Sequence, residues 1–169
     1  MKMSEIFLAE FDQEMASTRK SLERVPDDKL DWRPHDKSFT MQGLASHVAN
    51  IPSWMGVTLN EDSLDVAPEG GSTFKTPQGE SAKHLVEMFD KDVAEARKIL
   101  SETSDETFHQ PWKLLAGGKE VFTMPKAAVL RLFIFSHNIH HRAQLGVYLR
   151  LNDIPVPAIY GPSADEEGM

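Results

Sequence analysis

Apolar residues recur at intervals of three and four along most of the chain, which is the spacing of one face of an α-helix. Four segments carry this pattern, and we expect helices at residues 4–25, 41–59, 80–100 and 124–151. Ser4, Thr40 and Thr123 are placed to cap three of these helices, because a side-chain oxygen there accepts a hydrogen bond from a free backbone N–H. Pro52 falls inside the second helix and predicts a kink, since proline has no N–H to donate.

The segments between the predicted helices differ in character. Residues 60–79 are rich in Gly, Pro, Ser and Asp, which predicts a long surface loop. Two short β-prone runs, 108–114 and 119–122, flank Gly117-Gly118. A Gly-Gly pair between two such runs is typical of a β-hairpin, and this one comes directly before the last helix.

The C-terminal end of the chain is rich in proline and then acidic. Residues 154–162 are expected to be extended because their prolines cannot continue a helix. Residues 163–167 could fold back over a site, but a solvated acidic tail is the favoured interpretation. Four amphipathic helices in 169 residues predict an all-α fold, a four-helix bundle with a small β-hairpin, and one domain over 1–169.

Composition narrows the possible partners. The chain has 18 Lys and Arg against 26 Asp and Glu, for a formal net charge of −8, and no basic run that would attract a phosphate backbone. We therefore expect no nucleic-acid partner. No apolar stretch approaches the roughly 18 residues of a membrane span, and the N-terminus lacks a signal-peptide core, so we expect no membrane association and a cytoplasmic protein. The absence of cysteine excludes disulfides and thiolate metal sites.

Three histidines carry the candidate chemistry. His137 and His141 are four residues apart on the apolar stripe of the last helix, so their rings can approach one point. His47 lies on the inner face of the second helix. A buried imidazole is costly unless its polarity is satisfied, and a divalent ion such as zinc, nickel, cobalt or iron would satisfy three at once. The alternative is that each is an ordinary core histidine with its own hydrogen-bond partner.

These residues belong to a recognisable pattern. The segment His137–Leu145 resembles the HxxxHR-x-Q segment of the DinB-like, or YfiT-like, metalloenzyme family, and residues 32–34, 38–40 and 44–47 look like its other block. The resemblance implies an up-down-down-up four-helix bundle, often a homodimer, with a divalent ion on three histidines that match His47, His137 and His141. Characterised relatives include metal-dependent transferases and isomerases that use low-molecular-weight thiols such as bacillithiol or mycothiol, and some hydrolase-like members.

The preferred function is metal-dependent chemistry on a small electrophilic substrate, by thiol S-transfer or hydrolysis. Because the chain has no cysteine, any thiol must come from outside as a cofactor. The alternative is a noncatalytic module that binds a metal or a small ligand, with a structural or sensory ion. Imidazoles bind metal only when neutral, so we expect the metal affinity to fall below about pH 6.5.

Three residues near the histidine pair are candidates for catalytic roles. His140 could compete as a ligand, but its angular offset from the apolar stripe favours a role that faces the substrate. Arg142 is either a carboxylate anchor for a thiol cofactor or a salt-bridge partner at the edge of the bundle. Gln144 lies almost on the face of His137 and could hydrogen-bond a ligand imidazole or a substrate.

Overall fold

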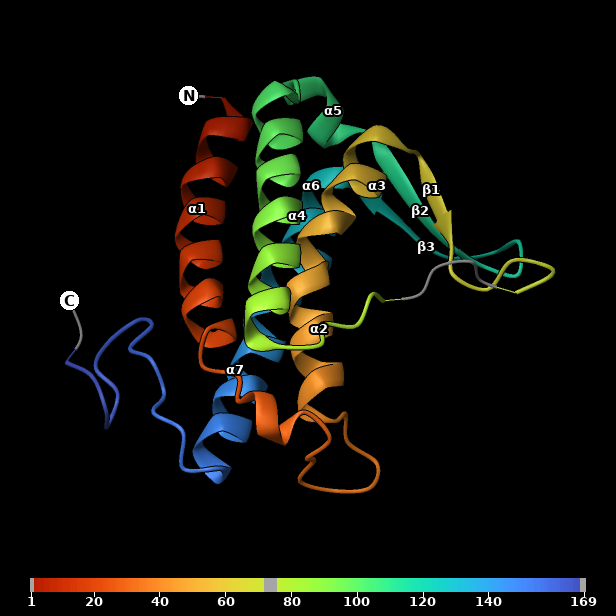
Figure 1. The fold of residues 1–169 in the computed structure, drawn as a ribbon. Helices are drawn as coiled ribbons and strands as arrows, with labels where there is room; N and C mark the ends of the chain where they lie inside the picture. Colours follow the sequence, from red (N-terminus) through yellow and green to blue (C-terminus); the bar gives the residue numbers. More distant parts are fainter. Residues whose placement is uncertain (1, 72–75, 168–169) are drawn as a thin grey trace.

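The computed structural model describes residues 2–71 and 76–167, and four of the helices in this part of the chain have ten residues or more (Figure 1). They are α1 (Met3–Leu22), α2 (Met41–Asn50), α4 (Ala82–Glu102) and α7 (His137–Leu151). Both α4 and α7 contact α1 on one side and α2 on the other. The fold is thus mostly helical with a small sheet at one side, while the predicted up-down-down-up order of helix directions stays a prediction.

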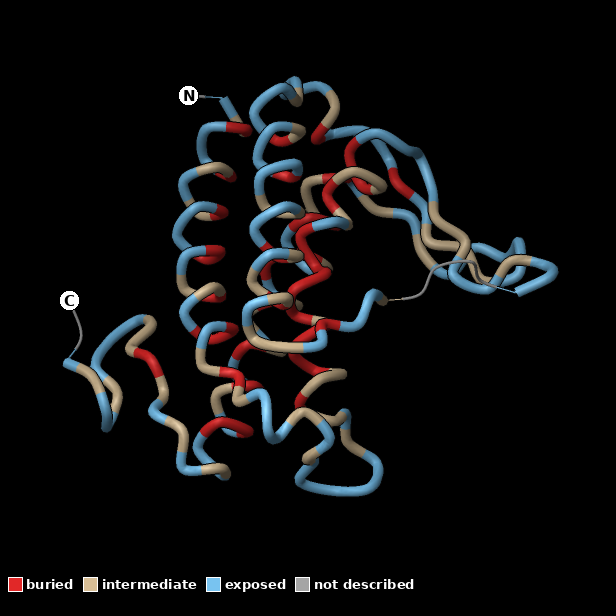
Figure 2. Tube along the Cα trace, viewed as in Figure 1, coloured by how far each residue is buried: buried red, intermediate tan, exposed pale blue. Residues whose placement is uncertain are grey.

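A single apolar core lies between these helices. Figure 2 shows that α1 turns its buried residues toward the other helices and its exposed residues outward. Phe7 and Phe11 of α1 pack on Phe135, with ring centroids 5.8 and 6.2 Å apart. In the described part of the chain, no helix combines the length and the apolar character needed to cross a lipid bilayer.

The helix starts agree only in part with the predicted caps. The prediction for Thr40 is confirmed, because its Oγ1 accepts a hydrogen bond from the Gly43 N–H at 3.0 Å. The prediction for Ser4 is wrong: α1 begins two residues after Met1, at Met3, and Ser4 is buried in its first turn. The prediction for Thr123 is also wrong, since this residue pairs with Lys113 in a strand.

The second predicted helix is broken where proline indicated. After α2, a 3₁₀ turn covers Ile51–Ser53, and a new helix α3 runs over Trp54–Asn60. Pro52 occupies the turn, where its missing N–H leaves the α-helical ladder interrupted. This break places Trp54 at the start of α3, beside the histidines described below.

The last predicted helix has three parts. It begins with α6 (Lys126–Val129), widens into a π-helical segment (Leu130–Ser136) and returns to α-helical geometry as α7. Pro125 is the residue that precedes α6 and is not in its first turn. Wide π turns occur frequently at functional sites, and this one ends directly at His137.

A three-stranded sheet projects from the helices on the side away from α1 (Figure 1). The predicted hairpin is confirmed as β2 (Pro111–Ala116) and β3 (Lys119–Pro125), joined by Gly117 and Gly118 at φ of +61° and +74°. Positive φ at both turn residues suits the right-handed twist of a hairpin and favours glycine.

Two short elements were not predicted from the sequence. Strand β1 (Ser63–Asp65) runs parallel to β2 within the segment expected to be loop. Helix α5 (Asp105–His109) takes the first residues of the run expected to be a strand. Both elements are five residues or shorter, and the hydrophobic pattern carries too few positions at that length to separate helix, strand and loop.

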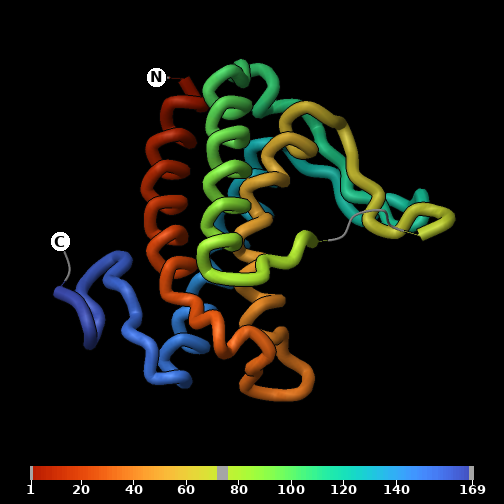
Figure 3. The backbone as a smooth tube through the Cα atoms, in the orientation of Figure 1, coloured from red at the N-terminus to blue at the C-terminus, as the bar shows by residue number. Residues whose placement is uncertain are grey.

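The C-terminal segment packs against the helices, although the residues expected to form a solvated acidic tail are largely exposed. Figure 3 shows the chain after α7 returning toward the lower end of α1. Glu166 pairs with Arg24, just after α1, and Asp165 pairs with Arg150 of α7. The same two carboxylates accept hydrogen bonds from backbone N–H groups of the tail, which holds it in a folded loop.

Candidate metal centre

His47, His137 and His141 meet between α2 and α7. One ring nitrogen of each lies within 4.8 Å of one ring nitrogen of the other two. The closest pair is His47 Nε2 and His137 Nε2, at 2.8 Å. The ring centroids lie 4.6 to 5.1 Å apart. The predicted convergence of these three side chains is confirmed.

The helices hold this arrangement through the residues that follow two of the histidines. Asn138, next to His137, donates from Nδ2 to the backbone oxygen of Val48, next to His47, at 3.4 Å. Its Oδ1 accepts a hydrogen bond of 2.6 Å from Thr18 of α1. Asn138 is fully buried, so these contacts fix the register of α7 against both neighbouring helices. Sequence reasoning missed this residue.

Aromatic side chains form the walls of the cluster. The ring of Phe39 stacks on His47 with centroids 6.0 Å apart. Trp54 presents its ring edge-on to two histidines, 5.7 Å from the His47 centroid and 5.2 Å from that of His137. Phe39 and Trp54 therefore shield the imidazoles of His47 and His137, and each of the three histidines is only half-buried.

Burial keeps these imidazoles neutral. Loss of hydration, the larger cause, and the neighbouring imidazoles together lower the pKa of His47 and of His137 to about 4. Burial also lowers the pKa of His141, although Gln144 opposes that shift. These shifts place the competition between protons and metal at lower pH than the 6.5 expected from the sequence.

Gln144 fixes the orientation of one ring. Its Oε1 lies 2.7 Å from His141 Nδ1 and can accept the proton of that nitrogen. With Nδ1 protonated, the lone pair of the neutral ring is on Nε2, the other nitrogen. Metal-ligating histidines characteristically have such an acceptor behind them. The hydrogen bond to a candidate ligand imidazole was one of the two roles predicted for Gln144.

His140 lies beside the cluster but is not one of its three members. Its ring centroid is 4.9 Å from that of His141, and the residue is exposed. The substrate-facing role of His140 stays a prediction.

Arg142 points toward α1 and not toward the three histidines. Its guanidinium lies 2.8 Å from the Glu14 carboxylate and also donates to Thr18 Oγ1 and to the Tyr160 hydroxyl. Only 4% of its side chain is exposed. This geometry favours the salt-bridge alternative over a cofactor anchor, although the ion pair is buried in the molecule and not at its edge.

The donor set fits a divalent cation. The two Nε2 atoms 2.8 Å apart form a hydrogen bond in which one neutral ring donates its proton to the other, and a metal ion would take the place of that proton once the rings separate. Ligands at about 2.1 Å from a tetrahedral ion are about 3.4 Å apart. The observed separations, 2.8 Å for the closest pair and no more than 4.8 Å for the others, bracket that value.

Comparison with known proteins identifies the family. A sequence model of the DinB family matches residues 1–168. The chain belongs to the DinB family. It is 27% identical over 162 residues to the uncharacterized protein YrdA of Bacillus subtilis (strain 168). The aligned region covers 95% of this chain and 89% of YrdA.

Two solved structures of DinB-like proteins have the same fold. One, from Bacillus cereus ATCC 10987, has a TM-score of 0.68 at 24% identity and covers 91% of this chain and 95% of its own. The other, YjoA from Bacillus subtilis, has a TM-score of 0.67 at 16% identity, and the match covers 96% of this chain and 98% of the YjoA chain. These similarities support a DinB-like fold for the whole chain.

Proposed function

We propose that this DinB-family protein binds one divalent metal ion through His47, His137 and His141. We further propose that it is a metal-dependent enzyme that acts on a small electrophilic substrate by thiol S-transfer or hydrolysis. The observation that carries the proposal is the convergence of three imidazoles, one ring nitrogen of each within 4.8 Å of the others, with lowered pKa values for all three.

The number of protein donors favours an enzyme over a structural ion. Among the described residues, the cluster contains three candidate ligands, whereas structural sites for such ions characteristically use four. A bound ion of this type lowers the pKa of a coordinated thiol or water and polarises a carbonyl or leaving group. Three protein donors leave a position open for such a group.

The chain's own residues supply orientation and shielding. Gln144 holds the His141 ring with its Nε2 free, and Asn138 holds α7 in register with α2. Phe39 and Trp54 cover the imidazole faces and restrict the access of water. Since the chain has no cysteine, thiol transfer requires a low-molecular-weight thiol as second substrate.

Metal analysis of purified variants tests the binding proposal. We expect about one equivalent of metal in the wild-type protein and a loss of stoichiometric metal in His137→Ala and His141→Ala, because two imidazoles hold these ions poorly. His140→Ala is the matched control, since it removes an adjacent histidine of the same helix and should keep the metal. Circular dichroism checks that all variants retain their helices.

The result that contradicts the ligand assignment is a full equivalent of metal in either His137→Ala or His141→Ala. Loss of metal in His140→Ala alone would assign the ion to a different histidine.

A spectroscopic and activity screen tests the catalytic half of the proposal. The protein is loaded with cobalt(II) and titrated with bacillithiol, mycothiol, glutathione and coenzyme A. We expect at least one thiol to change the visible cobalt spectrum and to react with a small electrophile in the presence of the protein. Stoichiometric cobalt whose spectrum responds to no thiol and to no change of solvent ligand would instead indicate the noncatalytic module.

A further inference from the structure

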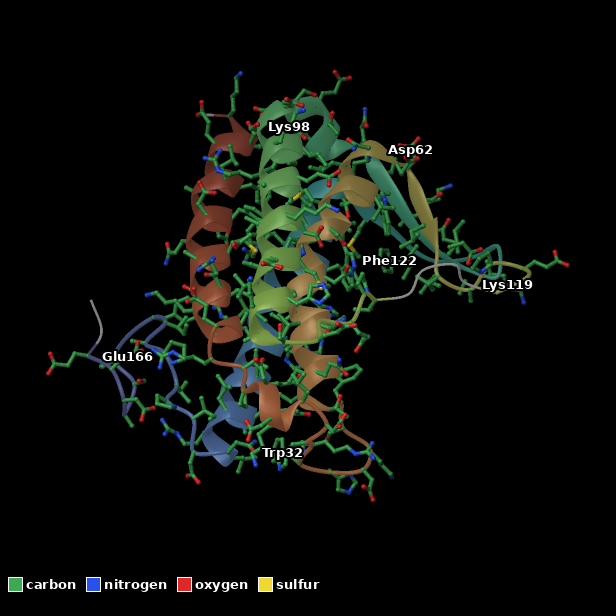
Figure 4. All side chains as sticks on the ribbon, in the orientation of Figure 1. Trp32, Asp62, Lys98, Lys119, Phe122 and Glu166 are labelled. Atoms are coloured by element: carbon green, nitrogen blue, oxygen red, sulfur yellow. The ribbon has the colours of Figure 1, made fainter. Side chains whose placement is uncertain are left out.

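A cavity of about 390 Å³ adjoins the histidine cluster on the side of the sheet. It lies between α3, the π-helical segment and the three strands. Phe122 of β3, which Figure 4 shows between the sheet and the helices, stacks on Phe133 with centroids 5.3 Å apart at one end of it. Its lining includes Trp54, Val57, Val66, Trp112, Phe122 and His137.

The walls of this cavity are almost entirely apolar. None of the described lining residues is an acid, a lysine or an arginine. The indole N–H of Trp112 already donates to the Val57 carbonyl at 3.1 Å, and the Ser53 hydroxyl donates to the Asn50 carbonyl at 2.7 Å. Aromatic and branched side chains with few free polar groups recognise the apolar part of a ligand.

Two residues connect the cavity to the candidate metal centre. His137 lines the cavity and contributes a ring nitrogen to the three-histidine cluster. Trp54 lines the cavity and contacts the rings of both His47 and His137. One end of a ligand bound in the cavity would therefore lie beside the histidines.

A second cavity, of about 450 Å³, does not share this connection. It lies between α7 and the C-terminal segment and is lined by Arg142, Val147 and Tyr160 among others. None of the three clustered histidines is among its described lining residues. Its position on the opposite face of α7 makes it a suitable comparison for the apolar cavity.

We infer that the cavity beside His137 binds the apolar part of the substrate, an aromatic ring or a branched alkyl chain of similar size, while the reactive end of the same molecule reaches the three-histidine centre. This inference rests on the proposed function. A volume of about 390 Å³ is near the lower end of the range of ligand pockets, roughly 300 to 1,000 Å³, and has room for a group of that size.

The first experiment tests the cavity without any metal. Trp54 and Trp112 line it, and they are two of the three tryptophans of the chain. We expect 4-nitrobenzyl alcohol, an aromatic quencher, to reduce the tryptophan fluorescence of metal-free protein with a saturable dependence on concentration. A linear dependence without saturation would overturn the inference.

The second experiment tests the connection to the metal centre. Acetohydroxamate and benzohydroxamate share a metal-binding head and differ in a methyl against a phenyl group. In cobalt-loaded protein, followed by visible absorption, we expect benzohydroxamate to bind at least about tenfold more tightly, because burial of the ring removes apolar surface from water. Equal affinities would overturn the inference and leave the proposed function intact.

Two matched double variants test whether the preference for benzohydroxamate over acetohydroxamate comes from the cavity. Val57→Phe with Val66→Phe fills its space, and we expect both saturable quenching and the phenyl preference to be lost while acetohydroxamate affinity is kept. The control is Val121→Phe with Val147→Phe, two exposed valines outside the cavity, of which Val147 lines the second cavity. Loss of the preference in the control would overturn the assignment.

The two proposals fail in different ways. Saturable quenching in a protein that binds no cobalt and no hydroxamate supports the cavity as a binding site but contradicts the proposed function. Circular dichroism of the filled variant shows whether it is folded; if it is not, the affinity ratio of the two hydroxamates in the wild-type protein still decides the inference.

Discussion

The protonation state of three side chains decides whether the cluster can bind a cation. Each imidazole is half-buried against aromatic rings and other imidazoles, and both features disfavour a positive charge. The neutral form is therefore the ground state of His47 and His137 well below neutral pH. This is the form that a divalent ion requires.

The first prediction concerns the pH dependence of metal binding. A proton competes with the ion only when the pH approaches the pKa of the metal-free folded protein, which is about 4 for His47 and His137 and not the usual 6.5. We expect the apparent affinity for zinc to fall less than tenfold between pH 7 and pH 6, since the pKa of His141 is also lowered, and to fall steeply below about pH 5. Competition titration with a chromophoric chelator of known pH dependence measures it.

Circular dichroism at each pH is the control, because a chain that unfolds in acid loses its site for another reason. A tenfold loss of affinity between pH 7 and pH 6 would mean that the imidazoles titrate normally and would contradict the burial argument.

The candidate ligands were predictable from the sequence, whereas their supporting residues were not. His137 and His141 are recognisable because four residues bring two side chains to one face of a helix. The contacts of Asn138 with Val48 and Thr18 join segments 90 and 120 residues away. No local pattern indicates such contacts, since they depend on how α7 packs against α2 and α1.

The helix boundaries show how far the local sequence determines where a secondary-structure element begins. Thr40 caps α2 as predicted. It directly precedes the amphipathic segment, so its hydroxyl can accept a hydrogen bond from a free backbone N–H in the first turn of the helix. Thr123 fulfils the same local pattern, yet it pairs with Lys113 in the hairpin. The strand pairing of β2 and β3 therefore overrides the local cap signal and moves the start of the helix to Lys126.

The second prediction compares these two threonines. We expect Thr40→Ala to lower the free energy of unfolding by about 1 kcal/mol, because the Gly43 N–H loses its acceptor. Thr123→Ala, at an exposed strand position, should cost about 0.5 kcal/mol or less. Urea denaturation measures both values. A larger loss for Thr123→Ala would indicate that the threonine caps the last helix after all.

The π-helical segment could not be predicted from periodicity. Leu130 and Ile134 are buried and His137 lies in the cluster, a spacing that an ordinary α-helix also allows. The wide turn becomes apparent only from the backbone, and it joins the part of the chain that packs under the sheet to the part that carries the histidines.

A polar network joins distant parts of the molecule, and the sequence indicated only that Arg142 could take part in a salt bridge, not its partners. Arg142 of α7 pairs with Glu14 of α1, and the Tyr160 hydroxyl of the tail donates to the same carboxylate at 2.7 Å. The network thus joins α1, α7 and the C-terminal segment. Arg142 directly follows His141 in the sequence, but its side chain lies on the other side of the helix.

The third prediction concerns this network. We expect Arg142→Ala to lower the free energy of unfolding by about 3 kcal/mol or more, because it leaves the Glu14 carboxylate buried without its partner. Arg150→Ala is the matched control: Arg150 also lies on α7 and pairs with the tail at Asp165, but on the surface, so its loss should be far smaller.

Thermal or urea denaturation separates the two arginine variants. Equal stabilities of Arg142→Ala and the wild-type protein would contradict the structural role and return Arg142 to the candidates for ligand binding. Retention of stoichiometric metal by a folded Arg142→Ala protein is expected, since its guanidinium makes no contact with the histidine cluster.

The most direct measurement is anomalous X-ray diffraction from crystals of the zinc- or nickel-loaded protein, recorded on both sides of the metal absorption edge. We expect one strong anomalous peak about 2.1 Å from a ring nitrogen of each of His47, His137 and His141. A loaded crystal whose peak lies elsewhere, or whose three rings enclose no peak, would contradict the proposed metal centre.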